Sequence, residues 1–141
     1  MRHQIKKTKF KKGYDAKRML LRKLSVNFLK RDSLLTTIKK AKILKTHLEK
    51  LLSKTKIETE ANKNYLLRLL GNQKLVKYLF KNVGPIIRDL TGGYVKIIKE
   101  NYRDSDGSLM ARVEWTRPVV NNDKNNDKVE NDKKNKVKNQ N

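Results

Sequence analysis

Apolar residues recur with the spacing of an α-helix in the first part of the chain. From Tyr14 onward, Ala16, Leu20, Leu24 and Phe28 follow one another every four residues, and Lys and Arg fall between them. Positions four residues apart lie on one face of a helix. The pattern therefore predicts an amphipathic helix that buries this face.

Three further helices are predicted before residue 90. The third of the four covers about residues 60–70, and Gly71 and Asn72 then supply a C-cap and an N-cap for a short fourth helix. Gly84 and Pro85 are expected to end or kink that helix. The apolar stripes of the second and fourth helices consist of Ala41, Leu44, Leu48, Leu51 and Leu52, and of Leu75, Val76, Leu79 and Phe80.

The apolar period falls to two after residue 93. In residues 109–115, every second side chain is apolar and most of those between are polar or charged, and residues 94–101 begin with the same alternation. This alternation is typical of strands with one buried face. Between them, Asp106 and Gly107 favour a tight hairpin, because both residues tolerate positive φ. Pro118 is expected to end the second strand. Residues 34–37 suggest a further brief strand but are too few to establish one.

These elements predict an α+β fold class. We expect one domain over residues 14–118, with the helices packed on one face of a small sheet. Residues 119–141 are mostly Asn, Lys and Asp and carry few apolar side chains, so this tail is expected to be disordered. Residues 1–13 form a basic N-terminal arm without acidic side chains.

Charge gives the first indication of function. The 141 residues include 36 Lys and Arg against 14 Asp and Glu, a formal net charge of +22. The last 21 residues hold six Lys and four acidic residues, so a net charge of +20 belongs to residues 1–120. Solubility of a small domain needs a net charge of only about 2–8. So large an excess is most simply neutralised by a polyanion such as a nucleic acid.

The same sequence disfavours several function classes. It has no Cys, and His3 and His47 cannot complete a three-ligand zinc site. It also lacks a GxSxG elbow and a GxxxxGK[ST] phosphate loop. We therefore expect no enzyme and no bound metal, cofactor or small-molecule substrate. No apolar run is long enough for a membrane span or a signal peptide core, so we expect a cytoplasmic protein.

Basic residues that could contact a polyanion follow one another along the chain. We expect the arm and the first two helices to form one cationic surface that neutralises phosphates. The residues concerned are Arg2, Lys6, Lys7, Lys9, Lys11 and Lys12 of the arm, Lys17, Arg18 and Arg22 of the first helix, and Lys39, Lys40 and Lys42 of the second.

Several segments resemble a known family in their order and spacing. They are residues 1–3, 36–42 with Leu44, 49–52, Leu79 and Phe80, 92–94 with Lys96 and Ile97, Arg103, Asp106, and 110–114. Together they resemble the family of the seventeenth protein of the bacterial large ribosomal subunit, over residues 1 to about 116. Each motif alone is only moderately specific, so the resemblance rests on their joint register.

The resemblance implies a structural protein that binds large-subunit (23S) ribosomal RNA near the nascent-chain exit, beside neighbouring ribosomal proteins. It implies a fold of one helix, one strand, three helices and two strands, which makes residues 34–37 an expected strand. It adds to the RNA-binding residues His3, Gly92, Gly93, Tyr94, Lys96, Arg103 and Arg112. The chain departs from the family at Ala16 and Lys17, where His-Arg is usual, and at Leu90, which replaces an arginine.

The residues alone also allow two other binding partners, DNA and an anionic membrane surface. A free nucleoid or DNA-binding protein would use the same charge, although no recognition-helix or zinc-finger signature is present. Attachment to an anionic membrane surface is disfavoured, because the apolar helix faces are expected to form a core.

Overall fold

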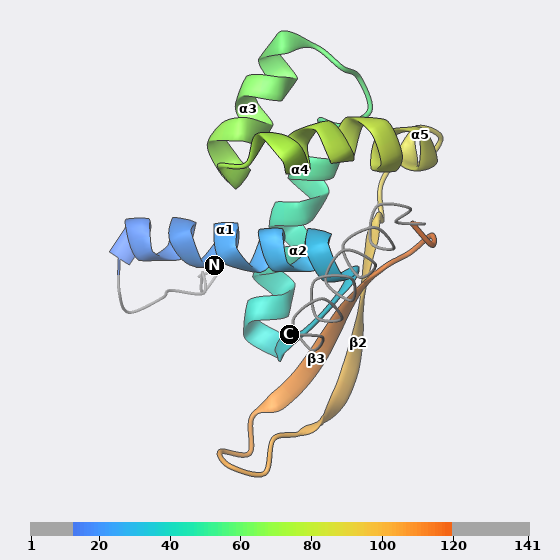
Figure 1. Ribbon diagram of the computed structural model, residues 1–141. Coiled ribbons are helices and arrows are strands. Elements are labelled where there is room, and N and C mark those ends of the chain that lie inside the picture. Colours follow the sequence, from blue (N-terminus) through green and yellow to red (C-terminus); the bar gives the residue numbers. More distant parts are fainter. Residues whose placement is uncertain (1–12, 120–141) are drawn as a thin grey trace, which may run out of the picture.

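The fold consists of a three-stranded antiparallel sheet with helices packed against one of its faces (Figure 1). The computed structural model describes residues 13–119. The elements in chain order are α1 (Gly13–Arg31), β1 (Ser33–Thr37), α2 (Ile38–Ser53), α3 (Glu60–Leu70), α4 (Gln73–Tyr78), the π-helical segment η1 (Leu79–Val83), α5 (Gly84–Ile87), β2 (Val95–Tyr102) and β3 (Leu109–Trp115). The predicted α+β class and the expected first strand are confirmed.

The last strand occupies the centre of the sheet. The strand order is β1-β3-β2, and both pairings are antiparallel. In this register Val113 lies opposite both Leu34 of β1 and Ile97 of β2. Ala111, Val113 and Trp115 are buried, as the alternating pattern predicted. Their side chains share one face of the strand, and this face contributes to the core.

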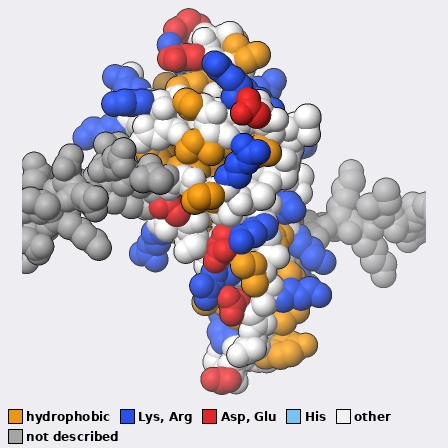
Figure 2. All heavy atoms as spheres, turned by 90° about the vertical axis from the view of Figure 1, so that its right-hand side faces the viewer, with side chains coloured by type: hydrophobic (Ala, Val, Ile, Leu, Met, Phe, Trp, Pro, Cys, Tyr) orange, Lys and Arg blue, Asp and Glu red, His pale blue; other side chains and the backbone are white. Residues whose placement is uncertain are grey.

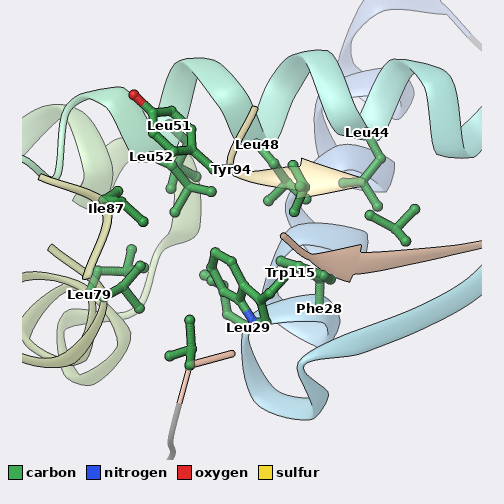
Figure 3. Packing of buried hydrophobic residues seen from close by; sticks show 14 of the residues in the cluster. Phe28, Leu29, Leu44, Leu48, Leu51, Leu52, Leu79, Ile87, Tyr94 and Trp115 are labelled. Carbon is green, nitrogen blue, oxygen red and sulfur yellow. The ribbon is translucent and has the colours of Figure 1, made fainter. Parts of the chain in front are cut away.

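The core lies where α1 and α2 cover the sheet (Figure 3). Phe28 of α1 is fully buried, and its ring centroid lies 4.8 Å from that of Trp115. α2 contributes five buried apolar residues, which are Ala41, Leu44, Leu48, Leu51 and Leu52. These match its predicted stripe. The opposite face of the sheet is open, with Leu35 54% and Ile98 40% exposed.

Asp32 ends α1 and turns the chain into β1. Its φ of 64° lies in the left-handed region, which non-glycine residues seldom adopt, and its N–H donates to the Phe28 carbonyl at 2.8 Å. Its carboxylate accepts a hydrogen bond of 3.3 Å from the indole Nε1 of Trp115. This single residue therefore joins the end of α1 to the end of the central strand.

The predicted caps between α3 and α4 are confirmed. Gly71 ends α3 with a φ of 67°, and the side chain of Asn72 accepts hydrogen bonds from the first N–H groups of α4. Of the two outcomes expected at Gly84 and Pro85, an end or a kink of the helix, the end does not occur: the helical path continues to Ile87, although it passes through the irregular π-helical segment η1. Pro85 lies in the first turn of α5, where a missing N–H is tolerated.

Gly84 allows α5 to approach the end of α2 closely. The residue is buried, and a Cβ atom added to it would lie 2.8 Å from the backbone oxygen of Thr55. Thr55 is itself 2% exposed and donates through its hydroxyl to the Leu52 carbonyl. Two backbone segments thus touch here without room for a side chain.

The loop between β2 and β3 differs from the tight turn predicted at Asp106 and Gly107. It spans residues 103–108, and of those two residues only Gly107 has a positive φ, of 61°. The Asp106 carboxylate instead binds the Arg103 guanidinium, at 2.8 Å from Nε, and the Ser108 hydroxyl. Arg103 and then Ser108 hold the pKa of Asp106 far below its usual range. These side-chain bonds, together with backbone hydrogen bonds between Arg103 and both Gly107 and Ser108, hold the loop in place of two positive φ angles.

The described fold reaches one residue beyond the predicted domain at each end. Gly13 begins α1, and Val119 is 9% exposed and belongs to the core cluster. The rest of the predicted arm and tail, residues 1–12 and 120–141, lies outside the described residues.

Candidate nucleic-acid interface

Two adjoining hollows lie where α1 meets α2 and α3. Their volumes are about 600 and 410 Å³, and both are lined by Lys17, Leu21, His47 and Lys50. We call the two together the basic groove. Its other lining residues are Tyr14, Asp15, Arg18, Met19, Arg22, Lys42, Ile43, Thr46, Tyr65, Arg68 and Leu69.

Positive charge is concentrated in the basic groove. Six Lys and Arg side chains line it, against the single carboxylate of Asp15. Lys42 and Lys50 share one face of α2, since they are eight residues apart, and Lys17 faces them from α1. Cations that lie together in a concave surface attract anions more strongly than scattered ones. The groove is therefore suited to a polyanion.

Arg22 links the two walls of the basic groove. Its Nε donates to the Leu69 carbonyl at 2.9 Å and its Nη2 to the Arg68 carbonyl at 2.6 Å. These carbonyls belong to the last turn of α3, where a cation satisfies groups that have no partner within the helix. Arg22, predicted from the sequence as an RNA contact, thus has a structural role as well, because it positions Arg68 beside α1.

His47, in the basic groove, is expected to make the stability of the fold depend on pH. Burial, and to a lesser extent the charge of Lys50, lowers the pKa of His47 from its ordinary value. Below about pH 6.5 the unfolded chain then binds more protons than the folded chain, so stability falls as the pH drops through the lowered pKa. Between about pH 7.5 and 5.5 we expect the wild-type melting temperature to fall further than that of His47→Gln. Equal falls in the two proteins would contradict this role.

Lys96, Arg103 and Arg112 lie away from the basic groove and are paired with carboxylates. On the open face of the sheet, Arg112 binds Glu100 at 3.0 Å, and Lys96 lies 3.6 Å from Glu114. Arg103 is bound to an aspartate in the hairpin loop. Figure 2 shows Lys and Arg mixed with Asp and Glu over the lower part of the molecule, where the hairpin extends. Lys96, Arg103 and Arg112, expected as RNA contacts from the family resemblance, are therefore not part of the basic groove.

Gly92, Gly93 and Tyr94 form the entry to β2. The carboxylate of Glu49 on α2 accepts hydrogen bonds of 3.2 Å from the N–H groups of Gly93 and Val95. Tyr94, expected as an RNA contact from the family resemblance, is only 3% exposed, so its ring packs in the core and has no free face for base stacking. The backbone of Gly92 and Gly93 is exposed.

Two other kinds of site are not found in the part of the chain that the structure covers. Residues 13–119 contain no group of three or more His, Cys, Asp and Glu side chains placed to hold a metal ion. No helix among them is long and apolar enough to cross a membrane.

Comparison with known proteins decides the family. The protein-family model described as ribosomal protein L17 matches residues 20–116 of this chain. The chain belongs to the ribosomal protein L17 family. The resemblance seen in the sequence is thereby confirmed, and with it the assignment to the ribosomal proteins.

Relatives from several bacteria support this assignment over most of the chain. The large ribosomal subunit protein bL17 of Methylacidiphilum infernorum is 33% identical over 120 residues, covering 85% of this chain and 92% of the relative. The bL17 protein of Natranaerobius thermophilus is 34% identical over 106 residues, with 75% and 94% covered. That of Persephonella marina is 33% identical over 117 residues, with 82% and 94% covered.

The fold of this L17-family chain brings together only some of the predicted binding residues. Lys17, Arg18, Arg22 and Lys42 all line the basic groove. Lys39 and Lys40 lie in the first turn of α2 and do not line it. The remaining basic residues predicted for the arm fall outside the described residues, and they are Arg2, His3, Lys6, Lys7, Lys9, Lys11 and Lys12.

Sequence reasoning missed Lys50 and Arg68 as members of the surface. Lys50 could have been found, because it follows Lys42 by eight residues and so shares its helical face. Arg68 could not, because it reaches the basic groove only when α3 docks against α1 through Arg22. In this L17-family chain the groove is thus a product of tertiary structure as well as of basic sequence.

Proposed function

We propose that this chain is a structural constituent of the large ribosomal subunit that binds its ribosomal RNA through the basic groove. The observation that supports this most directly is the gathering of six cations from three helices around one carboxylate. The basic residues of the N-terminal arm add to this binding. The cytoplasmic ribosome, near the nascent-chain exit and beside other ribosomal proteins, is the location that the family resemblance implies.

Phosphate neutralisation is the mechanism that fits this surface best. Lys17, Lys42 and Lys50 have no ion pair of 4.0 Å or less among those found within residues 13–119, so their charges are available to phosphates. Release of condensed counterions from RNA then supplies most of the free energy of binding. Cations on three separate helices can also bridge RNA segments that are distant in sequence.

Charge distribution gives the bound protein an orientation. The open sheet face balances Lys96 and Arg112 against Glu100 and Glu114. A balanced surface gains little from phosphates, since each cation already has a carboxylate partner. The basic groove therefore faces the RNA, and the hairpin points away from the phosphates that the groove contacts.

Removing three groove charges tests this mechanism. We expect Lys17→Gln/Lys42→Gln/Lys50→Gln to lower the slope of log affinity against log salt by about 2–3, because each lost phosphate contact removes about 0.7–0.9. Affinity for protein-free large-subunit ribosomal RNA would be measured between about 50 and 200 mM salt.

The matched control removes three exposed lysines from α4 and η1, as Lys74→Gln/Lys77→Gln/Lys81→Gln. It changes the net charge equally, so we expect a smaller change in slope. Equal losses in the two triple variants would show that total charge matters and the groove does not. Tighter binding to duplex DNA than to ribosomal RNA would favour a nucleoid protein instead.

Membership of the subunit is tested separately by sedimentation of a cell extract through sucrose gradients. We expect the protein to travel with the large subunit and to persist through a high-salt wash at constant stoichiometry. Recovery in soluble or DNA-bound fractions would contradict the proposed function.

A further inference from the structure

The basic groove contains more than cations. Tyr14 and Met19 of α1 are 75% and 49% exposed there, and Tyr65 of α3 lines the same hollow. Leu21 and Leu69 add aliphatic surface between the two helices. Phosphate neutralisation requires none of these side chains. Tyr65 and Leu69 are half-buried and also pack against the core, whereas Tyr14 and Met19 are exposed. Accessible rings and aliphatic groups beside cations are the composition of sites that bind unstacked bases.

Each tyrosine is paired with an arginine. The guanidinium carbon of Arg18 lies 5.8 Å from the centroid of the Tyr14 ring, and that of Arg68 lies 5.8 Å from the centroid of the Tyr65 ring. Both distances allow a cation–π interaction. One pair comes from α1 and the other from α3, so the larger hollow has an aromatic and cationic pair on two of its walls.

The walls are fixed relative to each other before any ligand binds. Arg22 of α1 holds the last carbonyls of α3 through its two hydrogen bonds. A Cβ atom added to Gly71, the C-cap of α3, would lie 3.5 Å from Nη1 of Arg22, so the backbone packs directly on the guanidinium. A site whose walls are already in place loses less entropy when it is occupied.

We propose that the larger hollow of the basic groove accepts one unpaired nucleotide of the RNA. The base lies against the rings of Tyr14 and Tyr65, and its flanking phosphates are held by Lys17 and Lys50. The volume of about 600 Å³ lies within the range of about 300–1,000 Å³ found for pockets that hold small ligands. This inference rests on the proposed function, and it adds recognition of an extruded base to the neutralisation of phosphates.

Two RNA hairpins with the same stem test the inference. One is fully paired, and the other carries a single bulged nucleotide, prepared in turn with each of the four bases. With the full chain we expect at least one bulged hairpin to bind roughly 5- to 100-fold more tightly than the paired one, the gain that stacking of one base supplies. Equal affinity for the paired and all four bulged hairpins would overturn the inference.

Replacement of the rings identifies the site. Tyr14→Leu removes an exposed ring that the fold does not need, and we expect it to reduce the preference for the bulged hairpin. Tyr65→Leu is expected to do the same, whereas Tyr65→Phe keeps the ring and the preference. Tyr102→Leu, on the distant hairpin and 68% exposed, is the matched control and should change nothing. A preference that survives both leucine replacements would overturn the inference.

Crosslinking gives a readout independent of affinity. With 5-iodouracil at the bulge, we expect ultraviolet light to attach the RNA to Tyr14 or Tyr65, as identified by mass spectrometry of peptides. Crosslinks found only outside the groove would contradict the inference. If bulged and paired hairpins bind equally but the groove lysine variant still lowers the salt slope, the pocket is refuted and the proposed function stands. If that variant leaves the slope unchanged, the proposed function itself fails.

Discussion

Trp115→Ala is expected to lower the free energy of unfolding by about 3–5 kcal/mol, because a large aromatic side chain is lost from a packed core. Trp115 is 8% exposed and packs on Phe28 at 4.8 Å between ring centroids. Its indole also donates to Asp32 at the end of α1. The loss would be measured by urea unfolding followed by circular dichroism, since the variant lacks the chain's single tryptophan.

Two variants separate the contributions of Trp115. Trp115→Phe keeps an aromatic ring against Phe28 but removes the Nε1 donor, so we expect an intermediate loss. Tyr102→Ala removes a ring that is 68% exposed and should cost less than about 0.5 kcal/mol. If Trp115→Ala cost no more than Tyr102→Ala, the core described here would not be the one that stabilises the protein.

Gly84→Ala is expected to lower the free energy of unfolding by about 1–3 kcal/mol, the usual cost of overpacking. In an ordinary helix this change stabilises by about 0.5–1 kcal/mol. Here the added methyl group would lie 2.8 Å from the Thr55 backbone oxygen, and backbone cannot rotate away as a side chain can. Thermal unfolding would show the loss, at roughly 4–8 °C per kcal/mol for a domain of about this size.

Gly92→Ala is the matched control for Gly84→Ala. Gly92 has no atom within 4 Å of an added Cβ, and its φ is not positive. We therefore expect its melting temperature to stay close to that of the wild type. A stabilised Gly84→Ala protein would mean that α5 and the end of α2 separate easily, against the close packing seen here.

Local periodicity was enough to predict most of the elements. The alternation in β3 is confirmed, because Val113 and Trp115 are buried on one face. The spacing of four in α1 predicts the helix, but only Phe28 of that stripe is buried, and Leu24 packs partly against the core. The brief strand at Ser33–Thr37 was only suggested by its residues, and the family resemblance made it an expectation. Its few residues carry no periodic signal of their own, because partners from the far end of the chain define it.

Other features depend on contacts that no local pattern contains. The close approach of Gly84 to the Thr55 backbone joins residues that are far apart in the sequence, and the burial of Tyr94 depends on where the chain enters β2. The carboxylates that pair with Lys96 and Arg112 lie on the neighbouring strand, and Glu114 also lies 3.9 Å from Arg112 along β3. A count of cations therefore overestimates the surface available to RNA unless the positions of the acidic residues in the fold are known.

The position of β3 has a consequence for the timing of folding during synthesis. In the described sheet β1 and β2 pair only with β3, which is also the last of its strands to be made. Because the chain is synthesised from its N-terminus, no two of these strands can form their native pairing until residues 109–115 are present. Until then the apolar faces of α1 and α2 lack the strand that covers them. The domain therefore completes its core only after nearly all of its own length has been translated.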